Sequence, residues 1–275
     1  MMKIDSHHHF WSLARGDYGW LTPDLAPIYR DFTPADLEPL LDAAGIDKTV
    51  LVQASDTIAE TEFLLRTARA HDRIGGVVGW IEMDAPDALD VLDRLAADPK
   101  FCGIRPMIQG IEDDEWILRP SLDPVFEALE SRGLTFDALV LPRHLKPLRA
   151  RLRRHPNLRC VIDHGAKPEL AKGDIAAWAD DIKAVAAEAN AFCKLSGLLT
   201  EAGDDPTLAK IRPVAEHLIC AFGPARLMFG SDWPVVNLAG DYPGWLEMVE
   251  ALISGLPAED RERIMGGTAR AFYRL

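Results

Sequence analysis

Two histidines near the start of the chain are the residues whose type and spacing are best suited to metal binding or catalysis. His7, His8 and His9 follow a short apolar stretch that predicts a β-strand. Side chains alternate between the faces of a strand, so His7 and His9 point one way and His8 the other. Two imidazoles on one face of a strand end can bind a metal ion or polarise a carbonyl group. We expect His8 to be structural.

An aspartate near the other end of the chain has a matching position. Asp232 follows the apolar run 227–230, which predicts another strand. A carboxylate beside a metal ion or several cations can take a proton from water and pass it to a leaving oxygen. We therefore predict that Asp232 is a general base and also a metal ligand, together with His7 and His9. The alternative is an aspartate that caps the following turn.

Three further charged or titratable side chains stand in or at the ends of predicted strands. His164 follows Asp163 and is predicted to act in catalysis, as a third ligand or a hydrogen-bond donor to an oxyanion. Its alternative is a buried histidine paired with Asp163. Arg105 and Lys194 are predicted to bind a substrate carboxylate or hydroxyl groups, or else to form ion pairs inside the site.

Aromatic side chains complete the predicted substrate site. Trp11, Trp80 and Trp233 can stack on a sugar-like ring, although aromatic residues at strand ends also serve as ordinary core. Gln53, at the end of the second predicted strand, is also predicted to bind substrate. The other four histidines lie beside charged residues and are predicted to be on the surface: His71, His144, His155 and His217.

Regular alternation of strands and helices must position these residues. The apolar runs that read as strands are 3–6, 49–54, 74–81, 102–106, 134–141, 159–163, 192–196 and 227–230. Amphipathic helical stretches lie between them, so the pattern predicts an α/β fold, a (β/α)8 TIM barrel. An open doubly wound sheet is the alternative, weakened because no G-x-G-x-x-G follows the first strand. In a barrel, the carboxyl ends of the strands would gather the candidate residues.

The chain shows no break in composition, so we predict one domain over residues 1–275. Residues 10–31 lack a clear helix or strand and contain several aromatic side chains. A loop of that length inside a compact domain is usually functional, and we expect it to cover the barrel mouth.

Composition limits the classes of partner. The 275 residues are 48% hydrophobic and carry a formal net charge of −13, which argues against nucleic acid and anionic membranes. No apolar run reaches membrane-spanning length and no secretory signal is evident, so a cytoplasmic protein is expected. The four cysteines form no C-x-x-C pair and are predicted to be buried reduced thiols: Cys102, Cys160, Cys193 and Cys220.

A set of short motifs along nearly the whole chain resembles one known family. The motifs are 4–11 (IDSHHHFW), 77–81 (VVGWI), 103–106 (GIRP), 136–137 (FD), 161–164 (VIDH), 194–198 (KLSGL), 228–234 (MFGSDWP), 267–269 (GTA) and 273–275 (YRL). Together they resemble the amidohydrolase superfamily, in the amidohydrolase-2 branch that contains L-fuconolactonases, L-rhamnonolactonases and sulfomuconolactone hydrolases.

The resemblance implies a metal-dependent-hydrolase-like barrel with His7, His9 and Asp232 around the reaction centre and His164 close by. Two-metal members of the wider superfamily carry a bridging lysine on the fourth strand, where this chain has Arg105. They also carry histidines after both strands five and six, whereas only His164 is found here. The resemblance therefore implies one divalent ion, with Zn²⁺ favoured, or activity without a metal.

The function implied by the resemblance is a lactonase of sugar-acid catabolism, an enzyme that hydrolyses a carboxylic ester ring. The small-molecule substrate is either a polyhydroxylated aldonolactone or a lactone that bears a carboxylate. A metal-dependent decarboxylase of the same superfamily is one alternative. A non-catalytic barrel that binds sugar acids is another. A homodimer is a further expectation, because outward-facing helices of such barrels often pair.

Overall fold

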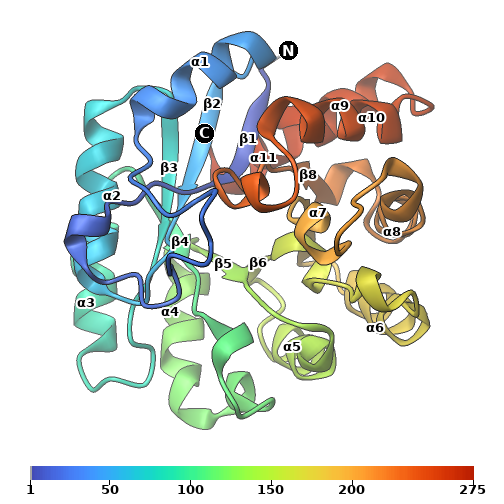
Figure 1. Cartoon of the computed structure of the whole chain (residues 1–275). Helices are drawn as coiled ribbons and strands as arrows, with labels where there is room; N and C mark the ends of the chain where they lie inside the picture. The colour runs from blue at the N-terminus through green and yellow to red at the C-terminus, as the bar shows by residue number, and fades with distance from the viewer. Residues whose placement is uncertain (1) are drawn as a thin grey trace.

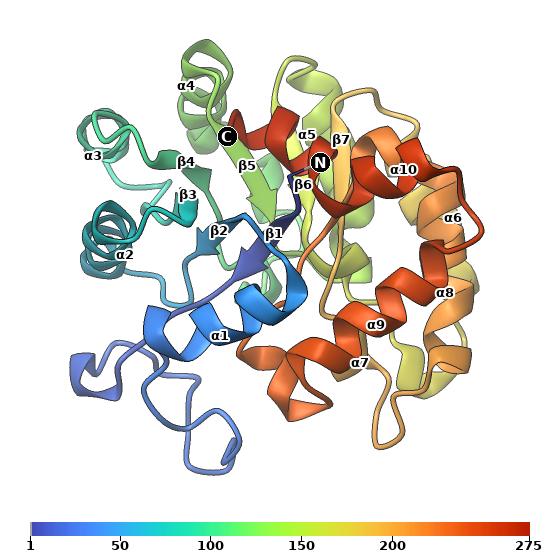
Figure 2. The ribbon, with the colours of Figure 1, turned by 90° about the horizontal axis from the view of Figure 1, so that it is seen from above.

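The computed structural model describes residues 2–275 and shows eight parallel strands arranged in a nearly closed barrel, with helices around it (Figure 1). Figure 2 looks nearly along the barrel and shows the strands at its centre. Neighbouring strands follow the chain order, which confirms the predicted (β/α)8 TIM barrel. The strands are β1 (Ile4–His8), β2 (Lys48–Val52), β3 (Ile74–Gly79), β4 (Phe101–Ile104), β5 (Thr135–Ala138), β6 (Arg159–Ile162), β7 (Ala191–Leu195) and β8 (Leu227–Phe229).

Helices cover the outside of the barrel. They are α1 (Pro34–Ala44), α2 (Ile58–Ala70), α3 (Ala88–Ala96), α4 (Asp123–Arg132), α5 (Leu145–Arg154), α6 (Ala176–Ala186), α7 (Leu198–Glu201), α8 (Leu208–Phe222), α9 (Tyr242–Ile253), α10 (Ala258–Glu262) and α11 (Thr268–Tyr273). Local sequence explains their limits. Thr33 and Pro34 begin α1, and Gly45 ends it with φ 63°, a conformation that glycine adopts without steric cost.

The first and last strands close the barrel through three short contacts. The Asp232 N–H donates to the His7 carbonyl at 2.8 Å, and the His9 N–H donates to the Trp233 carbonyl at 2.7 Å. Asp5 adds a side-chain contact, because its carboxylate accepts from the Ser231 N–H at 2.8 Å. β1 extends two residues beyond the predicted strand, to His8, so His7 lies within the strand and not after it.

The amino-terminal end of the barrel, where the strands begin, is filled by apolar side chains. Ile4, Val50, Val78, Val161 and Met228 from the strands are buried there together with Phe272 and Tyr273 from α11. Met2 and Leu275, the first and last residues that the structure describes, pack against these side chains. The last helix therefore closes the end opposite to the one where the strands finish.

Two histidines predicted to be on the surface are buried. His144 is fully buried, and its Nδ1 accepts from the Leu141 N–H at 3.1 Å. His155 is 6% exposed and its Nδ1 lies 2.9 Å from Glu130. Both flank α5, and polar neighbours in the sequence gave no sign that their rings pair inward. The prediction of buried thiols was also wrong for Cys220, which is exposed, and Cys102 is only partly buried.

None of the helices described in residues 2–275 is both long enough and apolar enough to span a membrane.

The close approach of β4 and β5 predicts that Gly103→Ala is strongly destabilising. A Cβ on Gly103 would lie 2.2 Å from the Thr135 carbonyl oxygen, a backbone atom that cannot turn aside. Such overpacking costs about 1–3 kcal/mol, which urea unfolding would measure. Gly255→Ala is the control, because a Cβ there meets nothing within 4 Å. Equal stability of the two variants would contradict the strand spacing.

Candidate active site

Residues from β1 and from the segment after β8 meet at the end of the barrel where the strands finish. His7 Nε2 lies 3.2 Å from His9 Nε2 and 3.6 Å from Asp232 Oδ1, and His9 Nε2 lies 3.3 Å from the same oxygen. The His164 Nε2 is 3.8 Å from Asp232 Oδ1. The structure thus brings together all four residues predicted to act on the substrate or bind metal.

The backbone near two of these residues is strained in a way that aims their side chains. Asp232 has φ 57° and His164 has φ 55°, values in the left-handed region that few non-glycine residues adopt. The neighbouring Gly197 is also left-handed, and a Cβ on it would lie 2.4 Å from His164 Nδ1. Ser196 Oγ lies 2.8 Å from that same nitrogen. The KLSGL motif therefore makes room for the His164 ring and orients it.

His9 and His8 each have a defined hydrogen-bonding partner. His9 Nδ1 lies 2.8 Å from the Val52 carbonyl oxygen, so this nitrogen must donate, and Nε2 of the neutral ring carries a lone pair. His8 points away from the site, as predicted, and its Nε2 lies 2.9 Å from Thr49 Oγ1. Hydrogen bonding to a backbone carbonyl is the usual way in which proteins orient a metal-ligating histidine.

The donor set fits a divalent metal ion. Tetrahedral zinc with bonds of ~2.0–2.1 Å holds its ligand atoms about 3.3 Å apart. The three separations among His7, His9 and Asp232 run from 3.2 to 3.6 Å. The lone pair of His9 Nε2 also faces a carboxylate oxygen, an arrangement that needs a cation or a proton between the two atoms. His7, Asp163 and His164 form a second group whose ligand atoms lie within 4.8 Å of one another.

Burial controls the protonation of the site. It lowers the pKa of His7 and His9, and it lowers the pKa of His164 to about 4, so these rings are neutral near pH 7. Burial alone would raise the pKa of Asp232, but the contacts with the surrounding histidines outweigh it and hold that pKa below its usual range. Asp232 is therefore ionised and can accept a proton.

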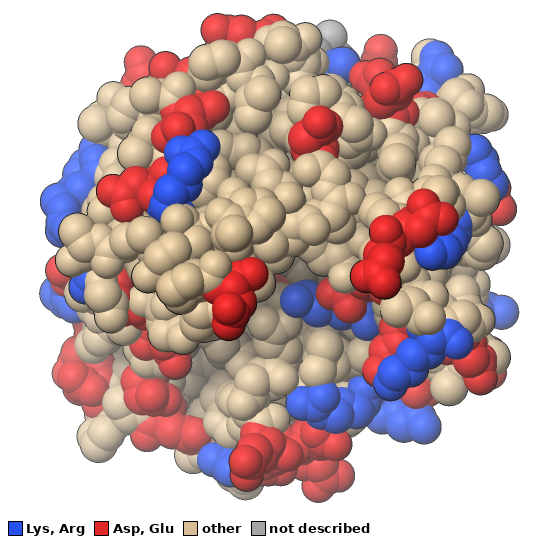
Figure 3. All heavy atoms as spheres, viewed as in Figure 1, with Lys and Arg blue, Asp and Glu red and all other residues tan. Residues whose placement is uncertain are grey.

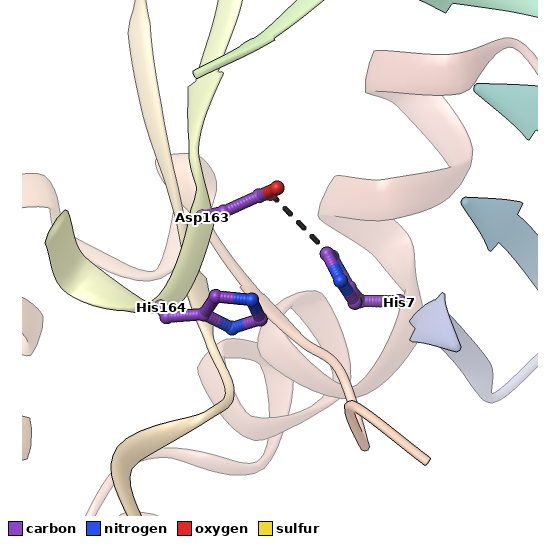
Figure 4. Close-up of side chains that lie close together, drawn as sticks. All are labelled: His7, Asp163 and His164. Carbon is purple, nitrogen blue, oxygen red and sulfur yellow. Dashed lines mark ion pairs between the residues drawn. The ribbon is translucent and has the colours of Figure 1, made fainter. Parts of the chain in front are cut away.

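The two predicted substrate-binding cations are buried among acidic partners. Arg105 is 3% exposed, hydrogen-bonds to the Gln53 carbonyl, and lies 3.4 Å from Asp163 Oδ2. Lys194 is fully buried and lies 2.6 Å from Asp137 Oδ2 and 2.9 Å from Asp163 Oδ1. Both cations thus follow the ion-pair alternative. Figure 4 shows Asp163 facing His7, whose Nδ1 is 3.5 Å from the carboxylate, with His164 beside them.

The predicted aromatic residues divide into two groups. Trp11 and Trp233 are 0% and 3% exposed and pack edge-on against Phe32, so neither has a free face. Trp80 is partly buried and lines a cavity at the ends of β2, β3 and β4, together with Trp20 from the 10–31 loop. Gln53 is buried beneath this cavity, and its amide donates to the Arg105 carbonyl at 2.6 Å.

This cavity has a volume of about 440 Å³ and is lined by Trp20, Trp80, Asp17, Asp56 and Glu82, among others. The 10–31 loop forms part of its wall, because the Trp20 indole donates to the Ala54 carbonyl at 2.7 Å. The loop therefore covers one side of the barrel mouth, as predicted. Figure 3 shows the molecule hollowed near the centre of one face, with acidic and basic side chains at the hollow.

Several residues of the site escaped sequence reasoning as functional candidates: Asp137, Asp163, Ser196 and Tyr273. A signal for one of them was present, because Asp137 is the single charged residue inside an apolar strand, as Lys194 is in another. A buried charge needs a partner of opposite sign. The sequence did not show that β5, β6 and β7 would bring these particular charges into contact.

Comparison with known proteins gives a consistent result. The amidohydrolase family model matches residues 4–275. The chain is 47% identical to an L-fucono-1,5-lactonase of Burkholderia ambifaria, over 99% of this chain and 96% of the relative. It is 36% identical to an L-fucono-1,5-lactonase of Burkholderia multivorans, over 100% of this chain and 96% of the relative.

Solved structures match the same family. Crystal structures of an amidohydrolase from Burkholderia multivorans match with TM-scores of 0.95 and 0.94 at 34% and 35% identity. Each match covers all of both chains. One of these structures contains bound zinc, and the other contains HEPES.

A zinc titration tests whether a metal ion binds at the histidine that faces the site and not at the one that faces away. We expect His9→Gln to weaken zinc affinity by at least about 100-fold, because it removes one of three protein ligands. His8→Gln, on the same strand, is the matched control and should change affinity little. Competition with a chromophoric chelator measures both. Equal loss in the two variants would show that the ion binds elsewhere.

Proposed function

Because this chain belongs to the amidohydrolase family, we propose that its strand-end cluster opens the ester ring of a sugar-acid lactone, in particular a neutral 1,5-lactone of the L-fucono type. The chain is a lactonase. The observation that carries the proposal is the convergence of His7, His9, His164 and Asp232 on one point at the barrel mouth. Free cysteines support a cytoplasmic location.

Asp232 supplies the base. Its ionised carboxylate takes a proton from a water molecule as the oxygen of that water attacks the lactone carbonyl carbon. The ring carbon–oxygen bond then breaks, and the proton held by Asp232 passes to the departing ring alkoxide. The product is a single open-chain hydroxy acid, whose new carboxylic acid group releases its proton to solvent near pH 7, so one water is consumed per turnover.

The histidines supply stabilisation for the developing negative charge. His164 is oriented by Ser196, with its Nε2 directed toward Asp232. His7 and His9 lie on the other side of the same carboxylate oxygen. A ring N–H of His164 or His7 can donate to the carbonyl oxygen as it becomes an oxyanion, and burial strengthens such a contact; the His9 ring cannot, because its N–H is directed to the Val52 carbonyl.

A divalent ion fits the same cluster. His7, His9 and Asp232 would hold it, and we propose Zn²⁺ because imidazole and carboxylate ligands suit that metal. A bound zinc ion polarises a carbonyl group and lowers the pKa of water. With or without a bound ion, the surrounding residues have the same proposed roles: Asp232 accepts the proton, and His164 faces the carbonyl oxygen.

The charges around the site favour a neutral substrate over one that bears a carboxylate. Lys194 is fully buried in ion pairs with Asp137 and Asp163, so it is not free to bind an anion, and Arg105 is nearly buried against the Gln53 carbonyl and Asp163. The cavity at the ends of β2, β3 and β4 instead presents Asp56 and Glu82, which accept hydrogen bonds from hydroxyl groups and repel carboxylates. Trp80 adds an apolar face of the kind that stacks on sugar rings.

The general base is tested by Asp232→Asn, which keeps the shape but cannot accept the proton. Loss of general base catalysis lowers lactone turnover by ~10²–10⁴-fold, measured as acid release at constant pH. Asp241→Asn is the matched control, because Asp241 caps α9 at an exposed position and asparagine caps equally well. A folded Asp232→Asn protein with most of its turnover would refute the assignment.

Substrate charge is tested with a panel of neutral aldonolactones and carboxylated lactones. We expect kcat/KM for the neutral class to exceed that for the carboxylated class by at least about tenfold, equivalent to ~1.4 kcal/mol. In Glu82→Gln the ratio should shrink, because one source of repulsion is removed. A preference for carboxylated lactones would contradict the charge argument but leave the hydrolytic function intact.

A further inference from the structure

Lys194 lies at the centre of the barrel, in contact with three groups. It is fully buried on β7, between the catalytic cluster and the apolar amino-terminal end of the barrel. Its ammonium donates to Asp137 Oδ2 at 2.6 Å and lies 3.0 Å from His7 Nδ1 in hydrogen-bonding geometry. It also makes an ion-pair contact with Asp163 Oδ1 at 2.9 Å. An ammonium group has three donors and no acceptor.

The contact between Lys194 and His7 fixes where the proton of the His7 ring lies. An imidazolium beside an ammonium at 3.0 Å would place two cations in contact, so His7 is neutral and carries one ring proton. Lys194 can only donate, so His7 Nδ1 must accept. The single proton of the ring therefore lies on Nε2, which points to the reaction centre.

The contact between His7 and His9 agrees with this tautomer in the metal-free protein, but a zinc ion held by both rings would give the same spacing, so the assignment depends on the Lys194 contact. The Val52 carbonyl fixes His9 Nε2 as an acceptor, and His7 Nε2 lies 3.2 Å from that nitrogen. Two lone pairs would repel at this distance, whereas an N–H on His7 Nε2 makes a hydrogen bond. One directed chain results: Lys194 donates to His7, His7 donates to His9, and His9 donates to Val52.

We propose that Lys194 is a positioning residue that holds His7 in its Nε2–H tautomer. His7 is then a hydrogen-bond donor to the reaction centre in the metal-free protein, and Lys194 opposes the use of that nitrogen as a metal ligand. This role differs from substrate binding, since the Lys194 side chain is fully buried.

Metal binding at His7 would require the ring proton to move from Nε2 to Nδ1, with no net loss of a proton. The hydrogen bond from Lys194 to Nδ1 would then break. The relocated proton would face Asp163 Oδ1, which lies 3.5 Å from Nδ1 and 2.9 Å from the Lys194 ammonium. Lys194 therefore sets how readily the site changes between a hydrogen-bonding and a metal-binding arrangement.

The position of Lys194 is itself fixed by contacts at the amino-terminal end of the barrel. The Tyr273 hydroxyl, on α11, donates to Asp137 Oδ2 at 2.6 Å, and Thr135 Oγ1 lies 3.2 Å from Asp137 Oδ1. These contacts fix the carboxylate to which Lys194 donates. The C-terminal helix thus acts on the site through Asp137 and Lys194, without touching substrate.

The tautomer can be read directly in the wild-type protein. Histidine side chains labelled with ¹⁵N, in protein stripped of metal by a chelator, show by two-bond correlation spectra which ring nitrogen carries the proton. The His7 signals are identified by their loss in His7→Asn. We expect the proton on Nε2. A proton on Nδ1, or on both nitrogens, would overturn the proposal.

A charge-balanced variant tests whether Lys194 is responsible. Lys194→Met combined with Asp137→Asn removes one positive and one negative charge, so the net charge of the site does not change. We expect the His7 proton to shift toward Nδ1 and zinc affinity to rise by about tenfold, equivalent to ~1.4 kcal/mol. Asp137→Asn alone keeps the lysine and should retain the Nε2–H tautomer.

An unchanged tautomer or unchanged zinc affinity in the folded double variant would overturn the role of Lys194. If that variant does not fold, the wild-type spectrum still decides the tautomer. Neither readout uses lactone turnover, so failure of this inference and failure of the proposed hydrolysis are distinguishable. The probe in the affinity measurement is Zn²⁺ alone.

Discussion

The seam between the first and last strands is the constraint on which the site depends. Two backbone hydrogen bonds, from Asp232 to His7 and from His9 to Trp233, join segments more than 220 residues apart in the sequence. Asp5 reinforces them by accepting from the Ser231 N–H. These bonds hold Asp232, the proposed general base, within hydrogen-bonding reach of the imidazole pair. The left-handed backbone at Asp232 then turns its carboxylate inward.

Below the seam, the barrel interior carries charges that balance one another. Lys194 and Arg105 face Asp137 and Asp163, and all four side chains are buried. Burying such charges is costly unless they are paired and hydrogen-bonded. Lys194 and Asp163 of these pairs both contact the His7 ring, so in our proposal the ion pairs also determine which ring nitrogen of His7 carries the proton. Because Lys194 is held in these pairs, it is not available to an anionic substrate, which links the interior of the barrel to substrate choice.

Much of this arrangement could be predicted from the sequence, and the limits have physical reasons. Alternating strands and helices predict the barrel, and period-two alternation correctly separates His8 from His7 and His9. The strand-end rule then gathers Asp232 and His164. Sequence alone does not say which buried charges meet, because that depends on strand register and side-chain reach across β5, β6 and β7. It also does not say that the rings of Trp11 and Trp233 are packed away.

A crystal structure of the protein with the open-chain acid that forms from L-fucono-1,5-lactone tests the central claim most directly. The account predicts that a carboxylate oxygen of the acid lies within ~3 Å of Asp232 or the histidine cluster, at hydrogen-bonding distance. Its hydroxylated chain should extend toward Trp80 and the acidic side of the adjoining cavity. Binding of the acid elsewhere, with no density among His7, His9 and Asp232, would contradict the assignment of this cluster as the active site.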